Sequence, residues 1–280
     1  MRELSCKKIS EAVALLCVEA NTVLPCDVKK LLDIAGQTEK SPAGKGVLQD
    51  LKENYILAEK EGLPICQDTG MAVVFADVGQ EIHITDGNFE DAVNEGVRQG
   101  YEKGFLRKSV VADPLRRINT GDNTPAVIHT RIVPGDKLTI NLAPKGFGSE
   151  NMSAMKMFLP SCTTDEILDF IVKTVEDAGS NPCPPVIVGV GLGGTVEMAA
   201  LISKKALTRS MDIRNTDSLY KDLEEKALKR INCLGLGPQG FGGTTTALAV
   251  NIEYFPTHIA GLPCVVNMSC HATRHAEAIL

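Results

Sequence analysis

Hydrophobic residues make up 44% of this 280-residue chain, which is enough for a packed core and argues against disorder of the whole chain. The formal net charge of −6 lacks the basic footprint of a nucleic-acid-binding protein. No stretch approaches about 18 consecutive apolar residues and the N-terminus lacks the apolar segment of a secretion signal, so we expect a cytoplasmic protein without a membrane span.

The first third of the chain is predicted to alternate between helix and strand. Apolar residues recur at three- to four-residue spacing over 9–20, which predicts an amphipathic helix. An apolar run over 71–78 predicts a strand. A second amphipathic helix is expected over 89–101, directly after Asn88, because asparagine is a favourable N-cap residue.

Two further strands are expected at 126–133 and 137–142. The second of them, "KLTINLA", alternates apolar and polar residues as a half-buried strand does. Because only Pro134–Asp136 separates the two runs, the sequence predicts that they pair as a hairpin.

The second half also mixes both kinds of element. A helix is expected to begin after Thr163, which forms a capping-box pattern with Glu166, and to end near Gly179. The run "PPVIVGVG", with its strand over 186–190, is continuously apolar, which is typical of a strand covered on both faces. The remaining elements are a helix over 219–231 and strands over 247–254 and 264–269. The mixture indicates an α/β or α+β fold, and with no clear linker we expect a single domain over 1–280.

Glycine-rich segments mark five probable loops beside apolar runs: "CQDTG", "INTGDNTPA", "PKGFGSENMS", "NPCPPVIVGVGLGGT" and "GLGPQGFGGTTT". Glycine permits close approach of the backbone to a ligand, and loops on a rigid scaffold often carry function. The segment "GVGLGGT" fits the dinucleotide-binding fingerprint poorly, because the last required glycine is missing. Nicotinamide binding is therefore not expected.

The nine cysteines divide by their surroundings. An odd count without a secretion signal indicates reduced thiols. Cys66, Cys183 and Cys270 each lie in a polar or glycine- and proline-rich segment. The others are expected to be structural, with Cys6, Cys17, Cys233 and Cys264 in the core. Three loop thiols are too few for a closed zinc site but enough for an iron–sulfur cluster with one iron free of protein ligands. From the spacing alone, three unconnected cysteines explain the pattern better.

The motifs taken together resemble a known family. "PICQDTGMAVVF", "INTGDNTPA", "NPCPPVIVGVGLGGT" and the run from "GLGPQGFGGTTT" through "NMSCHATRH" resemble the class I, iron–sulfur fumarate hydratases and the related L-tartrate dehydratases. The match runs in order from about residue 60 to the end. It covers the N-terminal half of the fused family members, so the chain is similar to a separate α subunit. The resemblance implies the α+β fold of that half, with small β-sheets wrapped by helices.

The resemblance also implies roles for particular residues. The metal ligands would be Cys66, Cys183 and Cys270, which hold a [4Fe–4S] cluster with one iron open to substrate. Gln67, Arg107 and Gly148 would bind the substrate. Asp68, which also contacts substrate, and His258 would be the catalytic residues. The residue types suit the chemistry, since a guanidinium can bind a carboxylate through two hydrogen bonds and carboxyl and imidazole groups transfer protons.

The implied activity is the reversible hydration of fumarate to L-malate, a reaction of the tricarboxylic acid cycle. The family's threonine base lies in the half that is absent here, so the resemblance implies a β-subunit partner, an α2β2 assembly and an inactive lone chain. Within the family, "KGFGSENMSAMKMF" favours fumarate over L-tartrate as substrate.

Two readings from other classes stay open. One is a redox iron–sulfur protein with Cys264 as a fourth ligand, and the other is a cluster-free structural subunit. His271, Arg274 and His275 flank the third cysteine and either tune the cluster or meet the partner; the sequence leaves both roles open.

Overall fold

The computed structural model describes residues 1–280, which divide into two compact units. Unit 1 contains Met1–Pro25, Asn54–Phe147 and Arg274–Leu280, and unit 2 contains Cys26–Glu53 and Gly148–Thr273. Each unit is built from segments that are distant in the sequence, which agrees with the lack of a recognisable linker. Both contain a small sheet and helices, and the α+β class is confirmed. A single functional domain over 1–280 stays a prediction.

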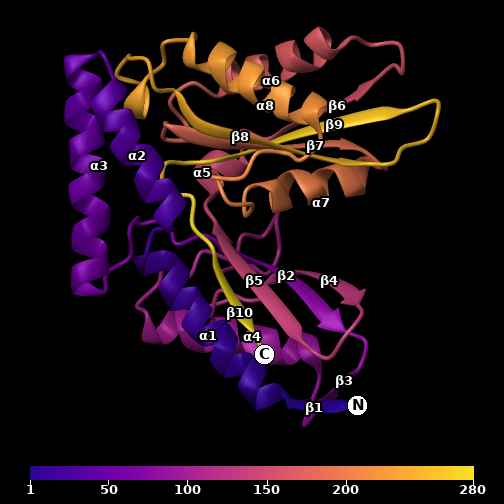
Figure 1. Ribbon diagram of the computed structural model, residues 1–280. Helices are drawn as coiled ribbons and strands as arrows, with labels where there is room; N and C mark the ends of the chain where they lie inside the picture. The colour runs from indigo at the N-terminus through magenta and orange to yellow at the C-terminus, as the bar shows by residue number, and fades with distance from the viewer. The chain divides into compact units, whose positions relative to one another are not determined.

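Unit 1 is built on a four-stranded sheet covered by helix α1 (Figure 1). Its strand order is β10-β5-β2-β4, and α1 contacts β5, β10 and α4. A separate parallel pair, β1 and β3, lies at the start of α1. The elements of unit 1 are β1 (Arg2–Ser5), α1 (Cys6–Thr22), β2 (Met71–Gly79), β3 (Ile82–Thr85), α4 (Phe89–Lys103), β4 (Val127–Val133), β5 (Leu138–Lys145) and β10 (Ala276–Ile279).

The prediction that the strands at 126–133 and 137–142 pair as a hairpin is wrong. β4 and β5 form as predicted, but β2 lies between them and pairs parallel with β4 and antiparallel with β5. The tight connection through Gly135 instead caps the end of β2, since Gly79 N donates to Lys137 O and Gln80 N to Val133 O. Burial explains the choice: the central position suits β2, whose residues are almost all buried.

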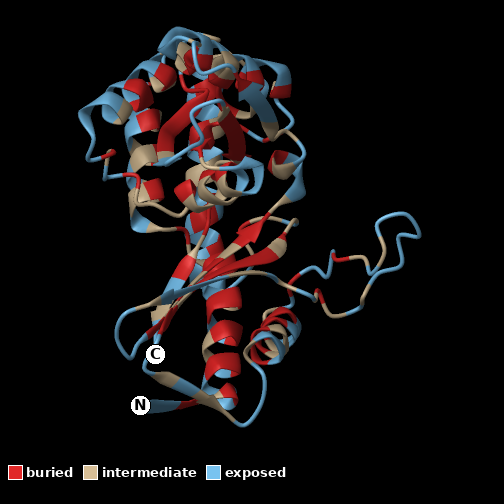
Figure 2. Ribbon diagram, turned by 90° about the vertical axis from the view of Figure 1, so that its right-hand side faces the viewer, coloured by how far each residue is buried: buried red, intermediate tan, exposed pale blue.

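Helices α1 and α4 pack closely because two glycines of α4 lie against α1. A Cβ atom at Gly96 would lie 2.6 Å from Val13 Cβ, and one at Gly100 would lie 2.6 Å from Cys17 Cβ. By length and composition the run Cys6–Thr38 could cross a membrane, but 56% of its most apolar window is buried inside the structure. Its apolar character is that of a core helix (Figure 2).

Unit 2 is built on a second four-stranded sheet, in the order β6-β9-β7-β8 (Figure 1). Helices α6 and α8 contact one another on one face, and α7 packs against β7, β8 and β9. The elements of unit 2 are α2 (Cys26–Thr38), β6 (Ala154–Phe158), α6 (Thr164–Ala178), β7 (Val186–Gly193), α7 (Val196–Ala206), α8 (Ser218–Asn232), the 3₁₀ turn η1 (Pro238–Gly240), β8 (Ala247–Phe255) and β9 (Leu262–Ser269), with α3 (Pro42–Glu61) and α5 (Phe147–Glu150) shared by both units.

β7 is buried along its whole length, as "PPVIVGVG" predicts. Its valines enter the core cluster with α6 and α8. Its glycines meet α7 instead: Cβ atoms at Gly189 and Gly191 would lie 2.2 Å from Ser203 O and 2.0 Å from Ala199 O. The glycines therefore allow close helix–strand packing, which explains their resemblance to a nucleotide-binding pattern without that function.

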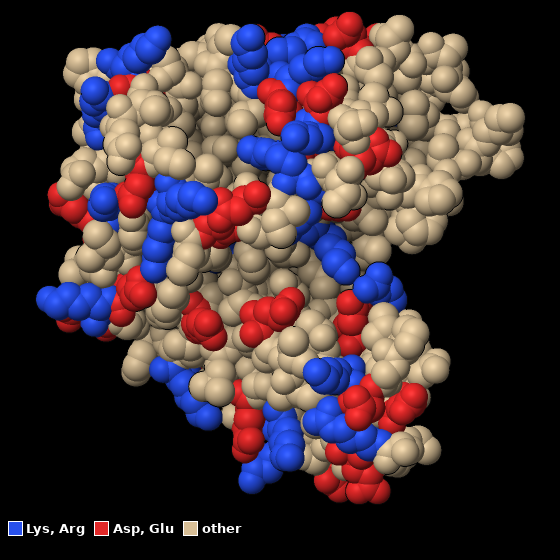
Figure 3. Space-filling view, viewed as in Figure 1, with Lys and Arg blue, Asp and Glu red and all other residues tan.

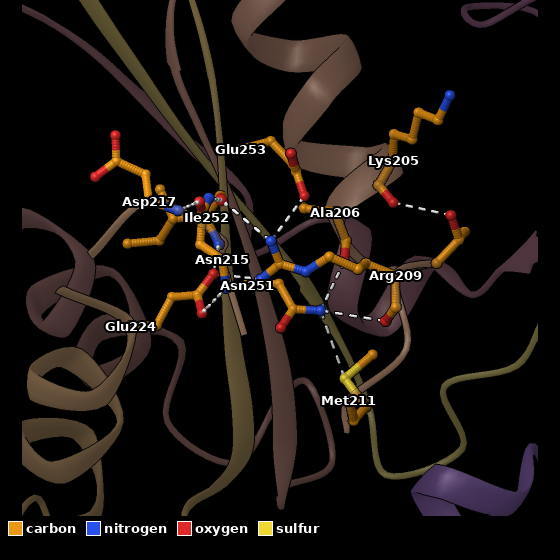
Figure 4. A network of polar contacts seen from close by, with 11 residues as sticks. Lys205, Ala206, Arg209, Met211, Asn215, Asp217, Glu224, Asn251, Ile252 and Glu253 are labelled. Carbon is orange, nitrogen blue, oxygen red and sulfur yellow. Dashed lines mark hydrogen bonds and ion pairs between the residues drawn. The ribbon is translucent and has the colours of Figure 1, made fainter. Parts of the chain in front are cut away.

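A buried ion pair ties the α7–α8 connection to β8 (Figure 4). Glu224 is fully buried, pairs with Arg209 and accepts hydrogen bonds from Ile252 N at 2.8 Å and Asn215 N at 3.1 Å. Arg209 also pairs with Glu253 at 2.9 Å. Both charges are compensated, which a buried pair requires.

Charged side chains on the outer faces of α6 and α8 are exposed to solvent (Figure 3). Arg230 of α8 pairs with Asp165 and Asp169 of α6. Three of the four cysteines expected in the core are buried, namely Cys6, Cys17 and Cys264. The fourth, Cys233, is exposed because it lies at the C-cap of α8, outside the helical pattern used to place it.

Candidate functional site

In unit 1, the first cysteine motif forms a loop that leads into β2. Cys66 and Asp68 are partly exposed and Gln67 is exposed. Asp68 shapes the loop, because its Oδ1 accepts from Gly70 N at 3.0 Å and its Oδ2 accepts from Phe147 N at 2.9 Å. The carboxylate is thus held in place by two backbone donors while the loop remains open to solvent.

The same loop is held from behind by buried polar groups. Tyr101, fully buried, donates its hydroxyl to Thr69 O at 2.7 Å and Gly70 O at 2.9 Å. Asn123 of "INTGDNTPA" bonds Gly70 O through Nδ2, and its Oδ1 accepts from Ser109 N. The asparagine therefore explains why that motif accompanies the first cysteine motif: it fixes the loop.

Arg107 lies beside this loop. Its carbonyl oxygen accepts from the Thr69 hydroxyl at 3.1 Å, and its side chain is exposed. The structure therefore brings Cys66, Gln67, Asp68 and Arg107 to one region of unit 1.

In unit 2, the second and third cysteine motifs meet at one end of the sheet. Cys183 precedes β7 and Cys270 follows β9, and the two strands are antiparallel neighbours. His271 N donates to Cys183 O at 3.3 Å, and His271 Nδ1 lies 3.1 Å from the same oxygen. Gly148 belongs to this region too, because a Cβ atom there would lie 3.4 Å from Asn181 O.

The fifth glycine-rich segment supports the two cysteine loops. Gln239 donates to Pro184 O through its backbone N–H at 2.7 Å and through Nε2 at 2.8 Å, and Nε2 lies 3.1 Å from His271 Nδ1. Cys183 and Gln239 both have positive φ, 54° and 53°. Non-glycine residues in this region are uncommon and concentrate at functional sites.

His258 lies elsewhere in unit 2. It belongs to the loop between β8 and β9, where its Nδ1 accepts from Ala260 N at 3.2 Å. Phe255 pairs with Gly193, the last residue of β7, whereas Cys183 precedes the first. The strand length places His258 roughly 20 Å from the cysteines. The structure does not bring His258 together with Cys183 and Cys270 within one chain.

No sequence motif points to Glu39, a buried carboxylate that bonds the end of the "GLGPQGFGGTTT" segment. It lies between α2 and α3, with 1% of its surface exposed. Glu39 Oε1 accepts from Lys40 N and Thr244 N, both at 2.8 Å, and Oε2 accepts from Thr245 N at 2.8 Å. Burial acts to raise the pKa of Glu39, but the hydrogen bonds from Ser41, Thr244, Thr245 and Lys40 outweigh it and lower the pKa to about 2.

Replacing Glu39 by glutamine is expected to lower the free energy of unfolding by about 3 kcal/mol at pH 7, which follows from a pKa of about 2 in the folded state against 4.5. A lowered folded-state pKa stabilises the protein above pH 4.5, and that contribution is lost as the pH falls from 4.5 through 2. Urea unfolding should therefore show the difference from wild type shrinking over this interval. Glu225→Gln, at an exposed position of α8, serves as the control. A difference that is constant with pH would contradict the assignment.

The chain is similar to known proteins along nearly its whole length. A family model described as "Fumarate hydratase (Fumerase)" matches residues 10–279. The chain belongs to the fumarate hydratase (Fumerase) family. It is 40% identical over 275 residues to a putative L(+)-tartrate dehydratase subunit alpha of Methanocaldococcus jannaschii, with 96% of each chain covered. It is 30% identical over 277 residues to the L(+)-tartrate dehydratase subunit alpha of Escherichia coli strain K12, with 98% of this chain and 91% of that one covered.

Membership of this family makes the chain a hydro-lyase α subunit, and its relatives' names imply a separate β subunit. They support the tartrate alternative at least as well as the fumarate activity preferred from the sequence. The donor set fits an iron–sulfur cluster held by three thiolates: Cys66 is partly exposed in unit 1, and Cys183 and Cys270 are accessible on adjoining loops of unit 2. The structure shows no group of three His, Cys, Asp or Glu side chains that could hold a metal ion.

Proposed function

We propose that this chain is the α subunit of a two-subunit, [4Fe–4S]-dependent L-tartrate dehydratase. Support comes from relatives that bear the name L(+)-tartrate dehydratase subunit alpha, putative in one case, and that this chain matches along nearly their whole length. The cluster ligands would be Cys66, Cys183 and Cys270. These three lie in accessible loops, whereas the exposed Cys26 and Cys233 lie at helix ends.

When bound, an iron–sulfur cluster of this kind supplies a Lewis acid for hydroxyl and carboxylate oxygens. The chain's own residues would then do the rest. Asp68, fixed by two backbone donors, is placed to move a proton at the departing or entering hydroxyl group. Gln67 and the exposed guanidinium of Arg107 would bind and orient the substrate, with Gly148 offering its backbone. The base and further cationic contacts would come from the β subunit.

His258 enters this proposal in a different way. Because the β7 strand separates it from the cysteine loops, a role for His258 at the cluster requires a second α chain. An α2β2 assembly in the cytoplasm, expected from the sequence, would supply one.

Fumarate hydration remains the second candidate. The family model is described as fumarate hydratase, and "KGFGSENM" carries the serine and asparagine that favour that branch. A redox protein with Cys264 as a fourth ligand fits less well. Cys264 is fully buried in β9, and it pairs with Leu192 near the end of β7 that is away from Cys183.

An assay of both reactions tests the proposal. The α chain is co-expressed anaerobically with its β-type partner, and kcat/KM is measured for L-tartrate dehydration and for fumarate hydration. We expect tartrate to be the better substrate by at least tenfold, and the α chain alone to be inactive. Faster hydration of fumarate would instead establish the second candidate. A lone α chain with full activity would contradict the two-subunit site.

A further inference from the structure

The guanidinium of Arg274 in unit 1 is buried and only partly bonded. Arg274 has 5% of its surface exposed. Its Nη2 donates to the carbonyl oxygen of Asp68, whereas Nε and Nη1 have no hydrogen-bond partner. A guanidinium has five N–H donors, so most of its donors are unused.

Arg274 lacks the anionic partner that a buried cation normally has. A buried charged group is stable only when it is paired and hydrogen-bonded. Arg209, which is less buried, pairs with both Glu224 and Glu253. Arg274 has no such carboxylate and bonds only a main-chain oxygen. It therefore has the charge and the donors to bind an anion that the chain itself does not provide.

Gly146 lies against both Asp68 and Arg274. A Cβ atom there would lie 3.2 Å from Asp68 Oδ2 and 4.0 Å from Arg274 Nη2, so a side chain at this position would crowd the Asp68 carboxylate and lie against Arg274. Lys145, the residue before it, is also buried, and its Nζ lies 3.4 Å from Gly146 O. The carboxylate oxygens of Asp68 accept from Gly70 N and Phe147 N, and Arg274 bonds the main chain of Asp68.

We propose that Arg274 binds one carboxylate group of the substrate, beside Asp68, through its unused N–H donors. The inference rests on the proposed function, which makes the substrate a small dicarboxylate. A planar guanidinium suits a carboxylate because it can donate two parallel hydrogen bonds. Since the same group holds the main chain at Asp68, a carboxylate bound there would lie beside the proposed proton-transfer residue. Arg274 would thus act in substrate binding.

Binding of succinate tests this. Succinate is a four-carbon dicarboxylate without a hydroxyl group or a double bond, so it binds without reacting. Calorimetry on the anaerobically purified α/β pair should show that Arg274→Gln weakens succinate binding by about 10- to 100-fold. Arg274→Lys keeps the charge but loses the two parallel N–H donors, so its succinate affinity should lie between that of wild type and that of Arg274→Gln. Arg131→Gln, at an exposed arginine paired with Asp77, should leave the affinity unchanged.

Three outcomes would overturn the inference. The first is unchanged succinate affinity in an Arg274→Gln enzyme that retains its iron and its melting temperature. The second is inorganic phosphate or butyrate binding as tightly as succinate, which indicates a general anion site. If Arg274→Gln does not fold, Gly146→Ala is measured in its place. That variant should also weaken succinate binding, because its methyl group would crowd Asp68 and lie against Arg274. Wild-type succinate affinity in Gly146→Ala would be the third outcome. Turnover of tartrate and fumarate, measured on the same preparations, reports on the proposed function separately.

Discussion

Replacing Cys183 by alanine is expected to remove the iron–sulfur cluster and with it essentially all activity, while leaving the fold intact. Cys183 is exposed, and its positive φ of 54° costs an alanine no more than it costs the cysteine, so little folding energy is at stake. The measurements are iron and acid-labile sulfide per α/β pair after anaerobic purification, with the melting temperature. Cys66→Ala and Cys270→Ala should behave in the same way.

Two other thiols provide matched controls for this experiment. Cys233 is exposed at the end of α8, and Cys264 is buried in β9. Cys233→Ala and Cys264→Ala should retain iron and sulfide at the wild-type ratio. Loss of the cluster in Cys264→Ala with its retention in Cys183→Ala would reverse the assignment and revive the redox alternative.

Replacing Asp68 by asparagine is expected to lower kcat by roughly 10²- to 10⁴-fold, the usual contribution of a positioned proton-transfer group. The substitution is nearly isosteric, but the amide nitrogen must face one of the two backbone donors that the carboxylate accepts, Gly70 N or Phe147 N. A modest loss of stability is therefore expected as well, of about 1–3 kcal/mol.

The two effects of Asp68→Asn can be separated. Iron content and melting temperature show how far the loop is disturbed, and kcat corrected for iron content gives the chemical effect. Asp77→Asn, in the same unit but paired with Arg131 on the surface, should leave kcat unchanged. An Asp68→Asn enzyme with wild-type iron content and kcat within about threefold of wild type would exclude Asp68 from proton transfer.

The elements that could be predicted from the sequence are those with local signals. Asn88 caps α4 by accepting from Glu90 N and Asp91 N, and Thr163 and Glu166 form the capping box that begins α6. Such contacts lie within three residues, so the pattern contains both partners. The pairing of β4 cannot be predicted in this way. β4 pairs with β2, which is distant in the sequence, and not with β5, which follows it after a short turn.

The site divides in the same way. The three cysteine loops were visible because several polar residues occur together in each. Glu39 is a single charged residue in an ordinary segment, and Arg274 belongs to the third cysteine motif, which does not contain its partner. Their partners are about 200 residues away: Thr244 and Thr245 for Glu39, and the carbonyl of Asp68 for Arg274. Only the folded chain reveals what these charges bind.

The strand order of unit 1 also constrains how this protein is made. A hairpin of neighbouring strands could close while the rest of the chain is still being translated, but the sheet β10-β5-β2-β4 cannot. Its central strand must wait for β4 and β5, and the edge strand beside β5 comes only at Ala276–Ile279. Contacts this distant in sequence slow folding. Unit 1 should therefore complete its core only after Ala276–Ile279 has left the ribosome, and shortening the chain before β10 should leave β5 with an unpaired edge.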